Sequence, residues 1–383
     1  MKLAIAGAAL LLLAAGAVVF GVLPPAALAE VAARVAPILG FVVAVTIVAE
    51  LAARAGLFDV VAAWLARLAR GRTLVLWFAI VALAVLTTAF LSLDTTAVLL
   101  TPVVVAVARA NGLNPLPFAF TTIWLANTAS LVLPVSNLTN LLAVERMPHL
   151  DVWGFVVLLG ASAAVAIGVT IGLLFVFHRR ELRGRFVVAP GPRVADRVQL
   201  WIAAVVVVVL LPSLVSGIEP WIPATAAAVV LVVVFAWRSP RALTPRLVPW
   251  SLLVFAAGLF AAIAALEAAG SAAVVAALAG AADSPAGLWR LAGVGMLSAN
   301  LLDNLPAYLL LEPVAHSPER LAAPLIGVNA GPLITPWASL ATLLWHARLR
   351  ADGVEVPWRR FILWGLVAAP LVVASAVLPL ALR

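Results

Sequence analysis

Long apolar runs, separated by short polar or basic breaks, dominate this chain. A helix needs about 20 mostly apolar residues to cross a bilayer, so each long run is a candidate span. Such runs lie at residues 3–23, 34–53, 152–177, 199–215, 221–237, 250–269 and 361–382. A shorter amphipathic segment at residues 57–69 is followed by arginines, and we expect it to lie at the membrane surface. The pattern predicts an all-α polytopic membrane protein.

Two further stretches are interrupted in a way that does not fit one straight span. The apolar run at residues 73–108 breaks at the polar segment 92–96. A re-entrant hairpin accounts for this break, because its polar tip is buried inside the protein and away from lipid. A second hairpin is predicted with its tip at residues 298–306, after a weaker helix at residues 271–281.

Each hairpin is followed by an apolar run with a central proline, at residues 118–144 and 321–345. Proline removes a backbone donor and interrupts a helix, so both runs are predicted to be broken helices. The first contains NTASLVLPVSNLTNLL from Asn127, and the second contains NAGPLITPWASLATLL from Asn329. A gapless alignment pairs the two asparagines and the two prolines. Matching interruptions in two halves of a chain are typical of the substrate site of a transporter.

We therefore expect two inverted-topology repeats, each with a re-entrant hairpin and a broken transmembrane helix. Residues 1–177 would form the first repeat with its N-terminal span. Residues 178–248 would form basic cytoplasmic loops and linking spans, and residues 249–383 the second repeat and the C-terminal span.

The distribution of positive charge predicts the orientation. Short loops rich in Lys and Arg face the cytoplasm. If the N-terminus is cytoplasmic, nearly all of the 24 Lys and Arg residues fall on that side, and the first hairpin enters from there while the second enters from outside. The exceptions are Arg34, Arg146, Arg290, Arg320 and Arg383. We expect a multi-pass protein of the bacterial cytoplasmic membrane.

Composition narrows the class of protein. With 65% hydrophobic and 10% charged residues, a soluble protein of this length is excluded. The net charge of +8 comes from short loops between apolar runs, so no nucleic-acid partner is expected. The chain has no cysteine, which excludes disulfides and thiolate metal sites, and its four histidines lie at the edges of segments. No cofactor and no metal site are expected.

Few carboxylates lie inside the predicted membrane region. Asp94 and Asp303 are at the two hairpin tips, and Glu50 and Glu267 are near the ends of spans. A buried carboxylate is costly unless it is paired, protonated or directed into the bundle. For the glutamates, solvation or pairing with a neighbour such as Arg54 is the simpler interpretation. For the aspartates, capping of a half-helix competes with ion coordination or proton transfer.

Amide and hydroxyl side chains crowd the first broken helix between Asn127 and Asn140. Single Ser or Thr residues in membrane helices usually bond to the preceding turn or to a neighbouring helix. Here Pro134 frees carbonyl groups at the same depth, and half-helix ends favour anions or oxygen-rich ligands. The cluster as a whole is therefore predicted to contribute to a substrate site.

Several of these segments resemble the arsenite/antimonite permease family, the arsenical pump membrane proteins of the ion transporter superfamily. They are FLSLDTTAVLLTP from Phe90, WLANTAS from Trp124 and LPVSNLTN from Leu133, together with NLLDNLP from Asn300, which is common across the superfamily. The resemblance implies export of arsenite or antimonite by two inverted repeats. It also implies that proton entry or a cytosolic ATPase subunit supplies the energy.

Arsenite near neutral pH is an uncharged trihydroxide, which hydroxyl, amide and carbonyl groups can hold by exchangeable hydrogen bonds. The predicted substrate-binding residues are Thr95, Thr96, Asn127, Thr128, Ser136, Asn137, Asn304, Asn329 and Thr335. The predicted proton-coupling residues are Asp303 and Asp94. Asp303 is the better candidate, because its hairpin enters from outside.

Two other readings of the sequence stay open at this point. The same architecture could serve as a Na⁺/H⁺ antiporter or a Na⁺-coupled dicarboxylate symporter, although no arginine lies at the hairpin tips that would attract a dicarboxylate. An intramembrane aspartyl protease using Asp94 and Asp303 would need sequence contexts that neither aspartate has. We therefore expect a transporter and not an enzyme. The expected partners of this transporter are arsenite or antimonite, protons or Na⁺, and lipid.

Overall fold

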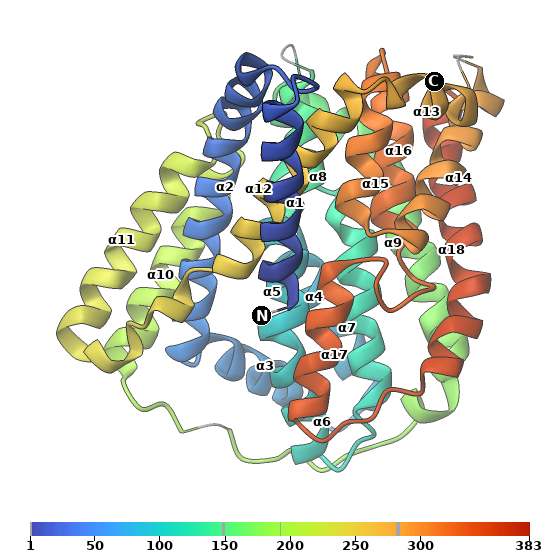
Figure 1. Cartoon of the computed structure of the whole chain (residues 1–383). Helices are drawn as coiled ribbons and strands as arrows, with labels where there is room; N and C mark the ends of the chain where they lie inside the picture. Colours follow the sequence, from blue (N-terminus) through green and yellow to red (C-terminus); the bar gives the residue numbers. More distant parts are fainter. Residues whose placement is uncertain (1, 148–149, 192, 281–283) are drawn as a thin grey trace.

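The computed structural model describes residues 2–147, 150–191, 193–280 and 284–383. Figure 1 shows a bundle of helices, and within the described residues the only β-structure is an isolated bridge between Arg72 and Arg185. Seven of the described helices are long and apolar enough to cross a membrane. The predicted class, an all-α polytopic membrane protein, is therefore confirmed.

One side of the bundle is built from five helices that pack on one another. They are α1 (Lys2–Val19), α2 (Pro25–Arg54), α10 (Arg197–Ser213), α11 (Trp221–Arg238) and α12 (Trp250–Ala268). The second helix is longer than the predicted run at residues 34–53. It begins directly after Pro24 and continues through Pro37. Proline is favourable in the first turn of a helix, which explains the earlier start.

Glycine allows the closest helix crossing in this group, where α1 passes α12. A Cβ on Gly7 would lie 2.5 Å from the Cα of Phe255, and a Cβ on Gly258 would collide with the carbonyl oxygen of Gly7. Small residues allow membrane helices to approach until their backbones touch, and van der Waals contact then stabilises the pair.

The first hairpin consists of α4 (Thr73–Leu91), the short α5 (Leu93–Thr95), the π-helical turn η1 (Thr96–Leu100) and α6 (Thr101–Ala110). The chain turns at Ser92, which has a positive φ of 95°, and the Ser92 hydroxyl accepts a hydrogen bond from the Thr95 amide. Both ends of the hairpin lie beside the segment after α9 (Val152–Leu182): the Thr73 amide donates to the Gly184 carbonyl at 3.2 Å, and the Ala189 amide donates to the side-chain oxygen of Asn111 at 2.8 Å.

The second hairpin consists of α14 (Pro285–Leu301), α15 (Asn304–Leu311) and the 3₁₀ turn η6 (Glu312–Val314). Its two ends lie at the upper end of the bundle in Figure 1, opposite to the ends of the first hairpin. The helix that precedes it, α13 (Ser271–Ala279), matches the predicted segment 271–281, of which Ala281 lies outside the described residues. The two hairpins thus enter the bundle from opposite ends.

Both predicted broken helices are present. The first is α7 (Leu116–Thr128), interrupted by the turns η2 (Ala129–Leu131) and η3 (Pro134–Ser136) before α8 (Leu138–Glu145). The second is α16 (Pro318–Ala330), followed after a break by α17 (Leu340–Ala351). Helix α18 (Trp358–Ala381) packs against α9, α14 and α16. The amphipathic α3 (Leu57–Leu68) lies at the lower end in Figure 1, and η4 (Pro240–Ala242) and η5 (Pro245–Leu247) connect α11 to α12.

Replacing Gly7 by Ala should destabilise the protein in detergent by about 1–3 kcal/mol, because the new methyl group must separate two touching backbones. The measurement is the free energy of unfolding or the thermal midpoint. Gly16→Ala is the matched control on the same helix, since nothing lies within 4 Å of a Cβ there. The control should be neutral or slightly stabilising. Equal effects of the two substitutions would contradict the close crossing.

Candidate functional site

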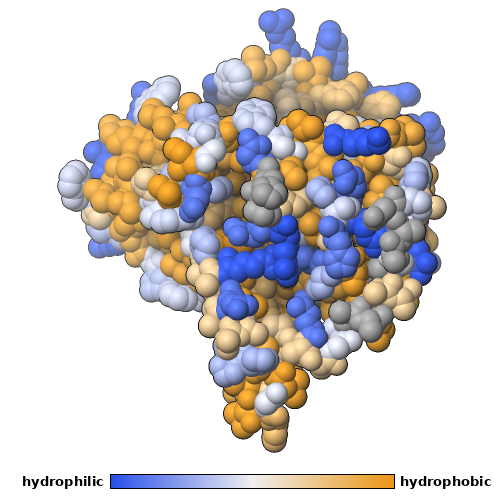
Figure 2. All heavy atoms as spheres, turned by 90° about the horizontal axis from the view of Figure 1, so that it is seen from above, coloured by the Kyte–Doolittle hydropathy of each residue, from blue (hydrophilic) through white to orange (hydrophobic). Residues whose placement is uncertain are grey.

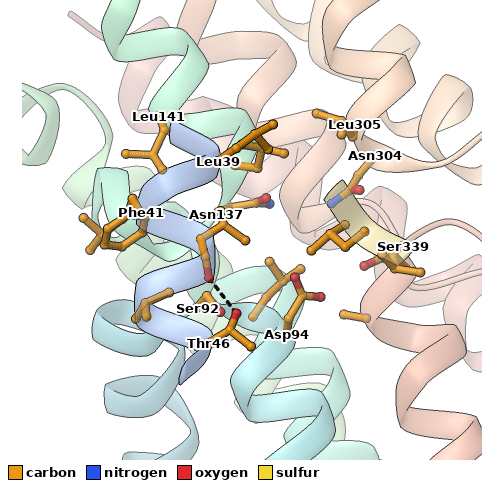
Figure 3. A pocket seen from close by; sticks show the side chains of 18 of the residues that line it. Leu39, Phe41, Thr46, Ser92, Asp94, Asn137, Leu141, Asn304, Leu305 and Ser339 are labelled. Atoms are coloured by element: carbon orange, nitrogen blue, oxygen red, sulfur yellow. Dashed lines mark hydrogen bonds between the residues drawn. The ribbon is translucent and has the colours of Figure 1, made fainter. Parts of the chain in front are cut away.

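A cavity of about 60 Å³ lies where the hairpin tips and the breaks of both broken helices meet α2 and α12 (Figure 3). Four of the predicted site residues line it: Asp94, Asn137, Asp303 and Asn304. In Figure 3, Asn137 and Asn304 approach from opposite walls, and Asp94 lies below them. The structure therefore brings together residues that are far apart in the sequence, from both predicted repeats.

Four helix N-termini end at this cavity. The residue immediately before each of these helices lines the cavity: Ser92 before α5, Asn137 before α8, Asp303 before α15 and Ser339 before α17. Free backbone N–H groups give a helix N-terminus a partial positive charge. The four ends thus direct donors toward one small volume. Ser92 and Ser339 were not among the predicted site residues, although Ser before an apolar run is a recognised N-cap signal.

The two aspartates have different local roles. The carboxylate of Asp303 accepts a hydrogen bond from the Leu305 amide at 3.2 Å and so caps α15. Asp303 therefore caps a half-helix, and proton transfer by the same carboxylate stays a prediction. At the first tip the capping side chain is Ser92, not Asp94. Asp94 is thus placed on the cavity wall without a capping role, and the capping interpretation is wrong for this residue.

Asn329 joins the two broken helices instead of lining the cavity. Its side-chain oxygen accepts from the Asn137 amide at 2.8 Å and from the Thr139 hydroxyl at 2.9 Å. Its amide nitrogen donates to the side-chain oxygen of Asn140 at 2.7 Å. Since Asn329 is fully buried, these bonds fix the position of Asn137 at the cavity wall.

The matching residue of the first half, Asn127, makes fewer bonds. Its amide nitrogen donates to the Ile123 carbonyl at 3.0 Å, and within the described part of the chain its buried oxygen has no partner. The buried hydroxyls of Ser339 and Thr342 in the second half likewise have none there. The repeated sequence pattern therefore does not produce two equal hydrogen-bond networks.

Three predicted threonines bond within their own segment and do not line the cavity. The Thr95 hydroxyl donates to the Leu91 carbonyl at 2.7 Å, and the Thr128 hydroxyl donates to the Trp124 carbonyl at 3.0 Å. The hydroxyl of Thr96 lies 2.8 Å from that of Thr88 on the other arm of the hairpin. These bonds fit the ordinary structural role of Thr in membrane helices.

Ser136 and Thr335 fasten the two breaks to the neighbouring hairpins. The Ser136 hydroxyl donates to the Ala89 carbonyl at 2.9 Å, and the Thr335 hydroxyl donates to the Asn300 carbonyl at 2.8 Å. The side chain of Asn300 also accepts from the Thr335 amide at 3.1 Å. Neither Ser136 nor Thr335 lines the cavity, so their role in this structure is to position the breaks.

An ion-paired cluster around the buried Glu312 lies between the cavity and the upper end of the bundle. Glu312 accepts from Arg34 of α2 at 2.6 Å and from the Tyr308 hydroxyl at 3.2 Å, and Arg146 lies 3.5 Å from its carboxylate. Arg34 also donates to the Leu142 carbonyl of α8 at 2.9 Å. The cluster ties α2, α8 and the second hairpin together. Figure 2 shows hydrophilic side chains gathered near the middle of the upper face, with apolar ones around them.

For one of the two glutamates near span ends, the structure tests the interpretation that it pairs with a neighbouring residue. Glu50 pairs with Arg54 one turn away, at 3.2 Å. Among the described residues, no group of His, Asp and Glu is arranged to hold a metal ion. The groups available to bind a cargo in the described site are therefore the side chains and helix N-termini that line the cavity.

A helical bundle in which two hairpin tips and two broken helices meet at one small cavity, lined by apolar residues and a few polar ones, has the architecture of a membrane transporter. The chain matches the citrate transporter family (CitMHS) over residues 1–345 and belongs to it. It also belongs with the arsenical pump membrane proteins, which confirms the resemblance found in the sequence. It is 30% identical over 369 residues to the arsenical pump membrane protein of Yersinia enterocolitica, covering 89% of this chain and 85% of the relative.

Other relatives agree with this assignment. The arsenical pump membrane protein of Escherichia coli is 29% identical over 371 residues, again covering 89% of this chain and 85% of the relative. Among solved structures, the YdaH transporter of Alcanivorax borkumensis has a similar fold, with a TM-score of 0.60 at 16% identity. The match covers 93% of this chain and 86% of that one.

Replacing Asn329 by Ala should cost at least about 2 kcal/mol of stability, because it leaves several buried polar partners without a bond. Asn127→Ala removes one bond to a backbone carbonyl and should cost only about 1 kcal/mol. Thermal unfolding in detergent would measure both. A stability loss for Asn127→Ala as large as that for Asn329→Ala would contradict the unequal networks.

Proposed function

We propose that the protein is a secondary active transporter that exports arsenite or antimonite in exchange for protons, by alternating access at the cavity between the hairpin tips. The observation that carries this proposal is the set of polar groups in the otherwise apolar lining of the cavity: amide and hydroxyl groups, four helix N-termini and two carboxylates.

This lining suits a small, uncharged, oxygen-rich cargo. Arsenous acid has three hydroxyl groups, each of which can donate and accept hydrogen bonds. The side chains of Asn137, Asn304 and Ser339 offer both donors and acceptors, and the free N–H groups of the half-helices add further donors. Without a thiolate, the cargo would be held by bonds that exchange readily, as release requires.

A citrate trianion fits the same cavity poorly, although the family carries the name of that cargo. None of the described residues that line the cavity is Arg, Lys or His, and Asp94 and Asp303 both face it. A desolvated polycarboxylate beside two carboxylates would be repelled unless cations accompanied it. The relatives named as arsenical pumps agree with the neutral cargo.

Proton coupling would use the two cavity carboxylates. Asp303 caps α15, so a proton that neutralises it also weakens the electrostatic support of that helix N-terminus. Binding and loss of a proton would therefore change the stability of the second hairpin tip. Asp94, which caps no helix, would hold the cargo or serve as a second proton site.

We further propose that the protein lies in the bacterial cytoplasmic membrane with its N-terminus and the basic loops in the cytoplasm. The ion-paired cluster of Arg34, Glu312 and Arg146 would then close the outer end of the cavity. Alternating access requires this end to open after cargo has entered from the cytoplasm. A cytosolic ATPase subunit remains an alternative source of energy.

The central experiment is uptake of arsenite, antimonite and citrate into everted membrane vesicles with an imposed pH gradient. We expect gradient-driven uptake of arsenite and antimonite and none of citrate. Asn137→Ala and Ser339→Ala should each lower the rate at least about tenfold, the effect of losing one well-placed hydrogen bond. Uptake of citrate without arsenite uptake would reject the proposed cargo.

Asp303→Asn should abolish uptake driven by the pH gradient and leave energy-independent arsenite exchange partly intact. Asn is as good an N-cap as Asp, so the α15 cap survives while the titratable group is lost. Asp94→Asn in the same assay is the matched variant at the other tip. Full gradient-driven uptake by Asp303→Asn would show that Asp303 does not carry the proton, and Asp94, Glu50 and Glu267 would be the next candidates.

The orientation can be tested with single cysteines, because the chain has none of its own. A label at Arg183→Cys should react only from the cytoplasmic side, and one at Glu145→Cys only from outside. Both side chains are exposed, so an impermeant thiol reagent can reach them. Reversed reactivity would overturn the proposed orientation.

A further inference from the structure

A second hollow lies far from the transport cavity, where the amphipathic α3 joins α4. It has a volume of about 550 Å³. Three arginines line it, Arg70 and Arg72 from the link between the helices and Arg185 from the loop after α9. We call these residues and their surroundings the arginine hollow. Leu68, Val75 and Phe186 contribute the apolar part of its wall.

Backbone hydrogen bonds hold together the two segments that carry these exposed arginines. The Phe186 amide donates to the Gly71 carbonyl at 2.9 Å, and Arg72 and Arg185 form an isolated β-bridge. Arg70 has a positive φ of 48°, a conformation that is uncommon for a residue with a long side chain. A Cβ on Gly71 would lie 2.7 Å from the Phe186 carbonyl oxygen, so only glycine allows the two segments to pair this closely.

The positive charge of the hollow is not neutralised by the protein. Among the ion pairs and side-chain hydrogen bonds of the described residues, none involves Arg70, Arg72 or Arg185, and no carboxylate lines the hollow. In addition, no side chain of the described residues caps the N-terminus of α4, where the Thr73 amide bonds to the Gly184 carbonyl and the next amides lack a side-chain partner. Three guanidinium groups beside a helix N-terminus form a strong site for a phosphate group.

An apolar stripe leads away from the hollow along the candidate membrane span α4. Val75 is 43% exposed, Phe78 is 48% exposed and Leu86 is 56% exposed, and their spacing places them on one face of the helix. Leu68 of α3, next to the hollow, is 53% exposed. The arginine hollow therefore lies at the end of an exposed apolar surface. A lipid could place its headgroup in the hollow and its acyl chain along that surface.

We propose that the arginine hollow binds an anionic phospholipid, with its phosphate held by Arg70, Arg72 and Arg185 and an acyl chain along Val75 and Phe78. Basic residues at the membrane surface attract anionic headgroups, and three arginines around one hollow make that attraction local. The site is independent of the cargo of the transporter, since it shares no residue with the transport cavity.

The test is native mass spectrometry of the purified full chain in detergent, titrated with phosphatidylglycerol, phosphatidylcholine or glycerol phosphate. We expect one phosphatidylglycerol to bind at least tenfold more tightly than phosphatidylcholine. The double variant Arg72→Gln/Arg185→Gln should weaken phosphatidylglycerol binding by about tenfold or more, since each arginine near the surface contributes to the attraction.

The matched control is Arg241→Gln/Arg246→Gln, which removes the same charge from exposed positions in the loop between α11 and α12. It should leave binding unchanged. An equal loss in the control, or unchanged binding in the Arg72/Arg185 variant, would reject the site. Equal binding of the two lipids would reject recognition of the phosphate charge. Glycerol phosphate binding as tightly as the lipid would show that the occupant is a free phosphate and overturn the lipid proposal.

Discussion

Unwound backbone in the middle of a membrane protein must find partners for its N–H and carbonyl groups, and the rest of this structure depends on how that requirement is met. Two helices break and two hairpins turn at the same depth. Side chains satisfy many of the freed groups: Ser136 bonds to Ala89, Thr335 bonds to Asn300, and Asn140 donates to the carbonyls of Ser130 and Leu133. The N-termini of four half-helices surround the cavity; side chains of Ser92, Asn137 and Asp303 cap three of them, and the side chain of Ser339 does not cap α17.

Much of the fold could be predicted from the sequence, because a bilayer makes apolar length and interruptions unusually informative. The long runs, both hairpins and both broken helices lie close to where the pattern places them. The start of α2 at Pro25 was missed because Glu30 and Arg34 shorten its apolar run. Arg34 is nevertheless accommodated within the helix, since it pairs with Glu312, which is distant in sequence. Pairing across distant segments cannot be read from local hydropathy.

The candidate site was harder to predict than the fold. Residue type and position identified Asp94, Asn137, Asp303 and Asn304, because polar groups at a break in the membrane are costly without a purpose. The same reasoning could not tell a side chain that lines the cavity from one that supports the wall. Asn329 is the clearest case: its sequence context repeats that of Asn127, yet its bonds reach Asn137, Thr139 and Asn140 of the other half. Which partner a repeated residue meets depends on three-dimensional packing.

The short helix α15 connects the cavity to the ion-paired cluster at the upper end. Asp303 caps its first turn, and Glu312 follows its last turn, where it bonds to Arg34 of α2. A proton on Asp303 would remove the negative charge that supports the first turn of α15, and Glu312 directly follows the last turn of the same short helix. In the proposed cycle, protonation at the cavity would therefore weaken the hold of the second hairpin on α2. The cap of the first hairpin is the neutral side chain of Ser92, so ionisation does not change this cap. In the proposed cycle this difference in capping would couple a proton to the helix cap only in the second hairpin, whereas a proton on Asp94 of the first hairpin would leave the Ser92 cap unchanged.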